Sequence, residues 1–203
     1  MNIFELASSL GLTNEDVEPR GWLVGKFSEG LATRLRDRPA GRYIGVTAIN
    51  PTPFGEGKTV VTIGLAMGLC KLGKRAICTL REPSLAPVFG IKGGGAGGGQ
   101  ATLVPLTEIN LHFTGDLHAV ASANNLLAAL IDNHTRRARE PSIDPTTLSW
   151  RRCIDMCDKG LSQIVSGLGG HPQAPLRETG FDLTAASEVM AILALSEDLV
   201  DLR

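Results

Sequence analysis

The sequence predicts an α/β fold in which a mainly parallel sheet is flanked by helices. Two apolar runs, Arg42–Ile49 and Arg75–Leu80, are predicted strands, and the first is apolar on both faces, as a buried parallel strand is. Between them, Gly57–Leu72 carries apolar residues at helical spacing, and Gly73 is suited to end the helix. A strand, a helix and a second strand in this order are typical of a parallel sheet, whose carboxyl edge binds ligands.

The segment between the first strand and the helix reads T-P-F-G-E-G-K-T over residues 52–59. Successive backbone N–H groups of such a loop can surround one anion, and the start of the following helix adds partial positive charge. Lys58 is expected to reach the terminal phosphates of ATP, and the Thr59 hydroxyl to bind Mg²⁺. The predicted nucleotide-binding residues are Thr52, Pro53, Phe54, Gly55, Glu56, Gly57, Lys58 and Thr59.

This loop departs from the usual phosphate-binding pattern at one position. The pattern G-x-x-x-x-G-K-[ST] requires glycine where this chain has Thr52, and Gly55 and Gly57 supply flexibility instead. The alternative is a glycine-rich turn that begins an ordinary helix and leaves Lys58 in solvent. The order of strand, Gly-Lys-Thr and helix favours the phosphate loop. We therefore predict a P-loop NTPase-like domain over residues 41–203, preceded by a helical lead-in over residues 1–40.

Two further catalytic candidates lie next to predicted strand ends. Arg81 directly follows the second predicted strand, so we expect it to share a sheet edge with Lys58. Asp116 follows a strand predicted at Ile109–Phe113 and precedes a helix predicted at Leu117–Leu130. Asp116 is a good helix N-cap, and it is equally a carboxylate that a phosphate-bound Mg²⁺ could use. Both interpretations of Asp116 stay open.

A glycine-rich stretch follows, K-G-G-G-A-G-G-G over residues 92–99. Such a run cannot form a stable helix or strand, because ordering so many glycines costs much entropy. It is either a flexible linker or a loop whose backbone approaches a ligand closely. Its position between two apolar segments favours the ligand loop.

Other helices are predicted from apolar spacing and capping residues: Asn2–Leu10, Leu148–Val165, and a last helix that begins at Asp182 or Thr184 and ends near Leu199. Asn124 and Asn125 lie in the middle of the predicted helix Leu117–Leu130, where asparagine is mildly unfavourable. If these two amides are buried, they need hydrogen-bond partners.

The composition excludes several classes of partner. A net charge of −1 and an aromatic content of 4% predict no nucleic-acid binding. No apolar run approaches a membrane span, and the first residues lack a basic targeting segment, so we expect a cytoplasmic protein without a membrane partner. The four cysteines are expected to be reduced, and Cys153 and Cys157 to be buried thiols in a helix rather than metal ligands.

Six segments in series resemble one known family, formate–tetrahydrofolate ligase, also called 10-formyltetrahydrofolate synthetase. They are T-P-F-G-E-G-K-T (52–59), R-E-P-S-L-A-P-V-F-G-I-K-G-G (81–94), I-N-L-H-F-T-G-D-L-H-A (109–119), A-N-N-L-L-A-A-L-I-D-N-H (123–134), W-R-R-C-I-D-M (150–156) and R-E-T-G-F-D-L-T-A-A-S-E-V-M-A-I-L (177–193). The chain departs from the family at four positions, Val60, Ala86, Gly95 and Gln100. Two of these, Gly95 and Gln100, lie in or directly after the glycine-rich stretch.

The resemblance implies a two-step ligase reaction. The family makes formyl phosphate from formate and ATP, and the amine of tetrahydrofolate then takes the formyl group, which gives 10-formyltetrahydrofolate, ADP and phosphate. By resemblance, Lys58 and Thr59 serve the ATP phosphates and Mg²⁺, and Arg81 binds the formyl phosphate. A monovalent cation is a further candidate cofactor.

Family members are far longer than 203 residues, and this chain resembles their N-terminal part. We therefore expect an incomplete nucleotide-binding domain that forms a homo-oligomer or associates with the missing C-terminal part. The alternative is a non-catalytic fragment, or half of a split enzyme, that binds ATP phosphates only. A P-loop ATPase or kinase of another kind is disfavoured by the series of motifs.

Overall fold

A computed structural model describes residues 1–89, 95–137, 139–168 and 176–202. The chain forms two compact units. The first comprises residues 1–83 and 91–114, and the second comprises residues 84–90 and 115–203. Across the described residues, no helix is both long and apolar enough to cross a membrane.

The first unit begins with a small helix and hairpin. Helix α1 (Ile3–Ser9) has Asn2 as its N-cap, and Asn2 and Glu5 form a reciprocal capping box. This confirms the helix predicted at the N-terminus, with slightly shorter bounds. The elements that follow are η1 (Asn14–Asp16), β1 (Val17–Pro19), β2 (Gly25–Phe27), which is antiparallel to β1, and α2 (Gly30–Leu35).

The small core of this region is apolar, with one charged group at its edge. Ala7, Val17, Val24 and Leu31 are buried. Asp16 accepts hydrogen bonds from the backbone and hydroxyl of Thr13, and it forms an ion pair with Arg34 at 2.5 Å. The backbone bond from Thr13, followed by the bond from Arg34, lowers the pKa of Asp16.

Helix α3 (Lys58–Lys71) confirms the helix predicted after the loop at residues 52–59. A two-stranded antiparallel hairpin, β3 (Gly97–Gly98) and β4 (Ala101–Thr102), packs against α3. The nearby segment predicted as a strand at 109–113 is wrong, because it belongs to helix α5 (Leu106–His112). A five-residue apolar alternation does not distinguish the two states, and Ile109 becomes buried as part of the helix.

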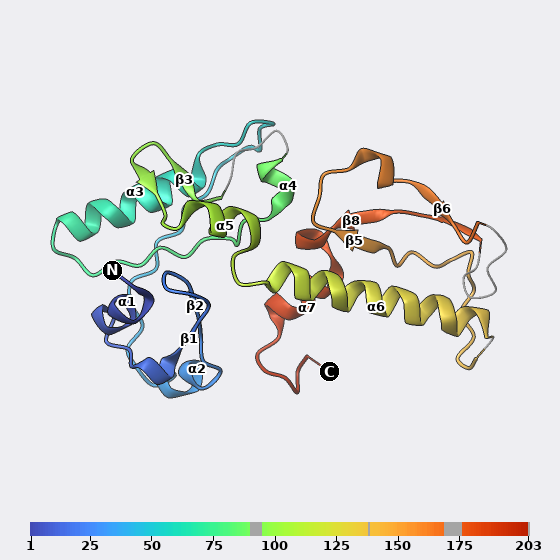
Figure 1. Cartoon of the computed structure of the whole chain (residues 1–203), viewed down its shortest axis with the longest axis horizontal. Helices are drawn as coiled ribbons and strands as arrows, with labels where there is room; N and C mark the ends of the chain where they lie inside the picture. The colour runs from blue at the N-terminus through green and yellow to red at the C-terminus, as the bar shows by residue number, and fades with distance from the viewer. Residues whose placement is uncertain (90–94, 138, 169–175, 203) are drawn as a thin grey trace. The chain divides into compact units, whose positions relative to one another are not determined.

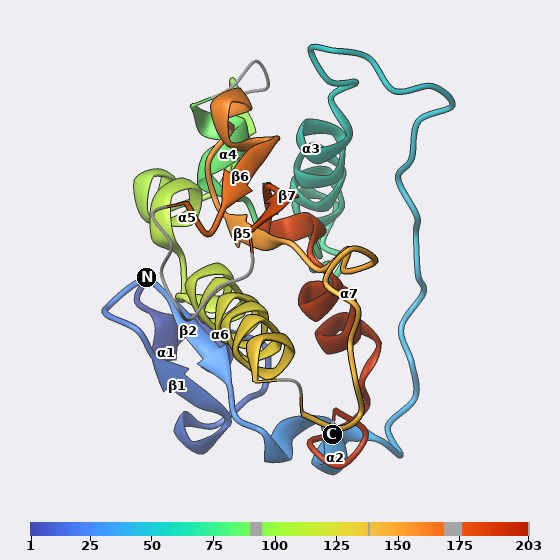
Figure 2. The same ribbon diagram turned by 90° about the vertical axis from the view of Figure 1, so that its right-hand side faces the viewer.

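The two strands predicted on either side of α3 are also wrong. Residues 42–49 and 75–80 have irregular backbone without ladder partners, and Figure 2 shows the first of them within a long trace without helices or strands. Tyr43 is 90% exposed, Ile49 is 99% exposed and Ile77 is 70% exposed. A strand requires a neighbour for its N–H and C=O groups, and the described residues of this unit supply none beside these segments.

The second unit is organised around one long helix, α6 (Asp116–Arg136), which confirms and extends the helix predicted at 117–130. Strand β5 (Arg152–Ile154) contacts α6 and pairs in parallel with β8 (Phe181–Leu183), so that Cys153 lies opposite Asp182 (Figure 1). The remaining elements of this unit are α4 (Leu85–Val88), η2 (Lys159–Leu161), β6 (Ile164–Ser166), β7 (Arg177–Thr179), which is antiparallel to β6, η3 (Thr184–Ala186) and α7 (Glu188–Leu195).

Two predictions need correction in this unit. The helix predicted at 148–165 is wrong, because β5, η2 and β6 occupy that segment. The last helix begins later than predicted, since Ser187 caps α7 by accepting a hydrogen bond from Met190 N–H at 3.3 Å. The mixed α/β class is thus confirmed. The mainly parallel sheet is wrong, because the described strands form two-stranded sheets of which only β5–β8 is parallel.

Candidate functional site

The candidate site is the loop at residues 52–59, which leads directly into α3. Gly57 is the N-cap of α3 with a φ of 76°, and Gly55 has a φ of 87°. Both values lie in the left-handed region that glycine adopts at no steric cost. The Gly55 N–H donates to the Thr52 carbonyl at 3.2 Å, which closes a turn at the start of the loop. The sequence produces a tight loop here because its two glycines flank Glu56.

Within this loop, Glu56 contacts both ends. Its Oε1 atom accepts a hydrogen bond from the Thr52 N–H, and its Oε2 atom forms a charge-assisted hydrogen bond with Lys58 Nζ. The hydrogen bond from Lys58, followed by that from Thr52, lowers the pKa of the Glu56 carboxyl to about 2. The carboxylate is therefore ionised at neutral pH. Sequence reasoning placed Glu56 in the loop but did not predict that it would bind Lys58.

The start of α3 offers further donors. No side chain caps the N-terminus of α3 within the described residues, so the first-turn N–H groups remain directed along the helix axis toward the loop. Thr59 is the second residue of the helix and is half-buried. Phe54, in contrast, is 82% exposed. The loop thus combines an ammonium group, a hydroxyl and helix N–H groups, which is a donor set for a phosphate.

Arg81 and Asp116 have different surroundings from those predicted. Arg81 lies in an irregular segment of the first unit with an exposed side chain, so the shared sheet edge expected for Arg81 and Lys58 is not formed. Asp116 is the first residue of α6 in the second unit, and Gly115 is the N-cap in its place. The interpretation of Asp116 as the N-cap is therefore wrong by one position. A carboxylate there still complements the positive end of the helix.

The glycine-rich stretch lies partly outside the described residues, which resume at Gly95. Gly97 has a φ of 92°, and a Cβ atom there would lie 2.0 Å from the Ala101 carbonyl oxygen and 2.8 Å from Ile63 Cδ1. Gly97 is therefore required by the close packing of β3 on β4 and α3. Packing alone therefore accounts for Gly97, and no ligand is needed to explain it. The role of the stretch as a ligand loop stays a prediction.

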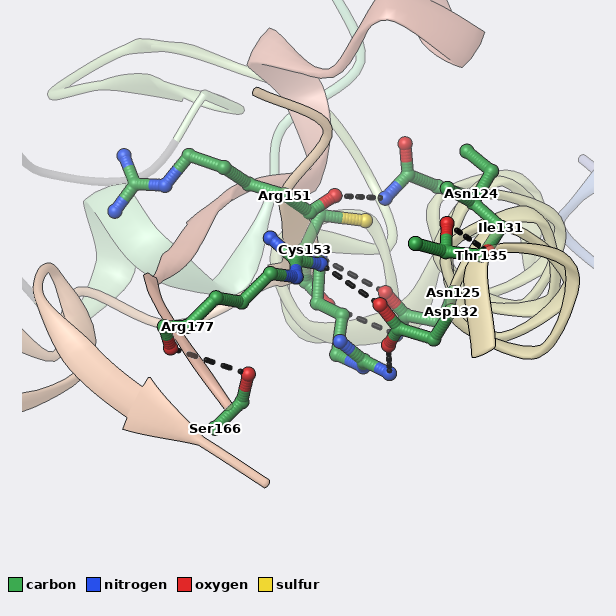
Figure 3. A network of polar contacts seen from close by, with 10 residues as sticks. Asn124, Asn125, Ile131, Asp132, Thr135, Arg151, Cys153, Ser166 and Arg177 are labelled. Carbon is green, nitrogen blue, oxygen red and sulfur yellow. Dashed lines mark hydrogen bonds and ion pairs between the residues drawn. The ribbon is translucent and has the colours of Figure 1, made fainter. Parts of the chain in front are cut away.

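A second polar cluster lies in the other unit, between α6 and β5 (Figure 3). The Asn125 amide bonds both backbone groups of one residue, accepting from Cys153 N–H at 2.8 Å and donating to Cys153 C=O at 3.0 Å. Asn124 donates to the Arg151 carbonyl at 3.1 Å. The half-buried Asn125 therefore finds both of its partners on β5, whereas the buried Asn124 finds a partner for its NH₂ group on Arg151 and its Oδ1 atom has none among the described residues.

Farther along α6, Asp132 accepts from two arginines. Arg152 approaches one carboxylate oxygen at 2.8 Å and Arg177 approaches the other at 3.0 Å, and Asp132 is itself buried. The sequence reasoning missed this cluster. A signal was present, because Val120, Asn124, Ala128 and Asp132 are the buried residues of α6 and recur every four positions, which places polar groups within the helix's buried stripe. All these contacts lie within the second unit, so the cluster joins α6 to β5 and β7.

Other possible sites in the second unit are less suited to chemistry. A pocket of about 380 Å³ includes Arg151, Ser162, Glu178 and Thr179 in its lining, but Arg151 is already paired with Asp182 at 2.7 Å.

All four cysteines are free thiols, as expected. Cys153 is buried in β5, which raises the pKa of its thiol, whereas Cys157 is exposed, so the prediction of a buried helical pair is wrong. Over the described part of the chain, no three His, Cys, Asp or Glu residues are grouped to hold a metal ion.

Comparison with known proteins gives one consistent result. The family model described as formate–tetrahydrofolate ligase matches residues 1–203. Proteins named formate–tetrahydrofolate ligase are similar to this chain in Roseiflexus sp. (strain RS-1), with 54% identity over 201 residues, and in Roseiflexus castenholzii, with 53% identity over 198 residues. The protein of that name from Rhizobium rhizogenes is 54% identical over 200 residues. These matches cover 98–99% of this chain but only 35–36% of each relative, so the chain spans about a third of their length.

Proposed function

The chain belongs to the formate–tetrahydrofolate ligase family, and on that premise we propose that it carries the phosphate-handling part of an ATP-dependent formate–tetrahydrofolate ligase. The observation that supports this most strongly is the match over all 203 residues, within which the loop before α3 joins Lys58 and Thr59 to a helix N-terminus. Residues 41–203 form the proposed nucleotide-binding domain. Its substrates are ATP, formate and tetrahydrofolate.

In the proposed reaction, a formate oxygen attacks the γ-phosphorus of ATP and the bond to ADP breaks. The amine of tetrahydrofolate then attacks the carbonyl carbon of formyl phosphate, and phosphate leaves. Two anions must meet in the first step, so the chain must supply positive charge where they approach. Lys58 is the proposed ligand of the transferred phosphoryl group. The helix N–H groups of α3 are its proposed partners.

The other candidates are proposed to serve the same reaction. Arg81 is proposed to bind formyl phosphate, because a planar guanidinium can form two parallel hydrogen bonds to an acyl phosphate. Asp116 is retained as a proposed catalytic carboxylate. The Thr59 hydroxyl, half-buried in the first turn of α3, suits a Mg²⁺ that neutralises phosphate charge when bound. A monovalent cation is a further proposed cofactor.

The chain spans about a third of its relatives, so the proposed partner is the part of the ligase that lies beyond the matched region. We propose that this part completes the folate and adenine sites. The second candidate function is binding of ATP phosphates without ligation. It is favoured by the loop geometry, which by itself contains a donor set suited to phosphate.

The test is an enzyme assembled from this chain and the downstream part of the relative from Roseiflexus sp. (strain RS-1). We expect formate-dependent ADP release and formation of 10-formyltetrahydrofolate, followed by absorbance of the acid-converted product. In the same assembly, Lys58→Ala should lower kcat/KM by at least about a hundredfold, which is typical of losing one charged group that stabilises a transferring phosphoryl group.

The intact relative serves as the control for substrates and assay. If the relative turns over and the assembled enzyme does not, the chain is not a functional ligase segment, and phosphate binding alone remains. If the assembled enzyme is active and Lys58→Ala is equally active, the phosphate role of the loop is contradicted.

A further inference from the structure

The lysine that should receive a phosphate is already paired with an anion of its own loop. Lys58 Nζ contacts Glu56 Oε2, and the second oxygen of the same carboxylate accepts the Thr52 N–H. The Glu56 side chain is only 14% exposed, although the ammonium partner is 46% exposed. The carboxylate therefore lies inside the loop and spans it from its first residue to the start of α3.

These contacts are of the kind that a phosphate oxygen makes. A phosphate-binding loop uses backbone N–H groups and a lysine ammonium as donors, and Glu56 accepts one bond from each type. A carboxylate and a phosphate are both anions, so they cannot share one ammonium without repulsion. Because the pKa of Glu56 is lowered to about 2, its charge is present throughout the neutral range.

The backbone around Glu56 permits the carboxylate to leave. Gly55 and Gly57, on either side of it, have positive φ values of 87° and 76°, and a Cβ atom at either glycine would meet nothing within 4 Å. Because both glycines have open surroundings and the widest choice of backbone angles, changes in their backbone angles can reorient Glu56 between them. The side chain of Glu56 is thus held by two contacts on a backbone that can turn.

We infer that Glu56 is an internal competitor of the nucleotide, which occupies Lys58 and the Thr52 N–H in the unliganded loop and must be displaced when phosphate binds. This inference rests on the proposed nucleotide function of the same loop. It assigns Glu56 the role of tuning affinity, because part of the attraction between Lys58 and phosphate is spent on releasing the carboxylate.

The variant that tests this is Glu56→Gln. Glutamine keeps an oxygen that can accept the Thr52 N–H and removes only the negative charge. Calorimetric titration of the 203-residue chain with Mg-ATP, and separately with pyrophosphate, should show binding about fivefold tighter than wild type at low salt. This is the size expected from removing one unit charge a few ångströms from a phosphate in water. The difference should shrink as salt screens the charges.

Three variants accompany it. Glu29→Gln removes one exposed carboxylate elsewhere in the first unit and should leave both affinities unchanged. Glu56→Ala also removes the charge, so it should tighten binding even if the glutamine adopts a different rotamer. Lys58→Ala should lose phosphate binding. Circular dichroism of each variant establishes that α3 is still formed.

The outcomes separate the inference from the proposed function. If wild type binds, Lys58→Ala does not, and neither Glu56 variant binds more tightly, then the loop binds phosphate but Glu56 is a structural residue and the inference is overturned. If only the Glu56 variants bind, the internal competitor is strong and the inference is supported. Absence of binding by every variant overturns both the inference and the phosphate loop.

Discussion

At position 81 the choice between the two long cationic side chains matters, because guanidinium and ammonium groups bind an anion differently. Arginine presents a rigid planar fork of N–H donors, whereas lysine presents a compact, strongly hydrated charge. An acyl phosphate carries a carbonyl oxygen and several phosphate oxygens, two of which can accept the parallel N–H donors of one guanidinium. A fork can hold it in one orientation, while an ammonium can only attract it.

Arg81→Lys therefore tests whether residue 81 binds formyl phosphate. In the enzyme assembled with a relative's downstream part, we expect formate-dependent ADP release to fall by tenfold or more while the affinity for Mg-ATP changes less than twofold. Both quantities can be measured on one preparation, by coupled ADP assay and by calorimetry. An unchanged rate would assign Arg81 to a structural contact, and an equal loss of ATP affinity would assign it to the nucleotide.

Among the elements, α6 and β5 show how a helix can substitute for a strand. β5 pairs with β8 along one edge, and its backbone is also bonded by the Asn125 amide, while Asn124 bonds the carbonyl of Arg151 just before the strand. The Asn125 amide forms the same pair of bonds with Cys153 that an opposite residue in an antiparallel ladder would form. A three-residue strand would otherwise leave buried polar groups unpaired, since Cys153 is only 2% exposed.

Asn125→Ala should therefore destabilise the second unit. Leaving the Cys153 N–H and C=O unpaired costs about 1–3 kcal/mol for each group, so a total loss of at least about 2 kcal/mol is expected. Urea unfolding followed by tryptophan fluorescence gives the measurement in a Trp22→Phe background, in which the remaining Trp150 lies next to β5.

The matched control is Asn133→Ala, which removes an amide from the same helix but not from the contact with β5. It should change the free energy of unfolding by less than about 0.5 kcal/mol, as is usual away from buried networks. Equal effects of the two substitutions would show that helix propensity, and not the bonds to β5, determines the loss.

Over the whole chain, each unit exposes more large apolar side chains than a stable monomer usually does. In the first unit they include Tyr43, Ile49 and Ile77, and in the second they include Leu195 and Val200. Large exposed apolar side chains become buried where such a surface contacts another polypeptide. Since the chain spans about a third of its relatives, the remaining part of such a ligase is the partner we expect for these surfaces.

The 203-residue chain by itself should accordingly show concentration-dependent association and negligible ligase turnover. Light scattering over a tenfold range of concentration measures the first, and the acid-converted folate product measures the second. Positioning two reactants in one site can contribute about 7–11 kcal/mol, so a chain that does not hold tetrahydrofolate near formyl phosphate loses measurable transfer. Sustained turnover by the isolated chain would mean that it contains a complete folate site. A concentration-independent monomer would contradict the association.

Part of this architecture was determined by the sequence alone. Helices α1, α3 and α6 were predictable because apolar spacing, capping residues and terminal glycines act within one or two helical turns. The loop at 52–59 was identified for a similar reason, since its glycines, lysine and threonine are contiguous. The family was recognisable from six short segments in series.

The tertiary structure decided the rest, because strands and polar clusters depend on partners far away in the chain. Residues 42–49 and 75–80 have strand-like sequences but form no ladder, as no neighbouring strand pairs with them among the described residues. β5 became a strand because β8 pairs with it and Asn125 of α6 bonds the backbone of Cys153. Asp132 is bound by arginines 20 and 45 residues away, a distance over which no local pattern acts. The pairing of Glu56 with Lys58 is close in sequence, yet it depends on two side-chain rotamers that only the folded loop selects.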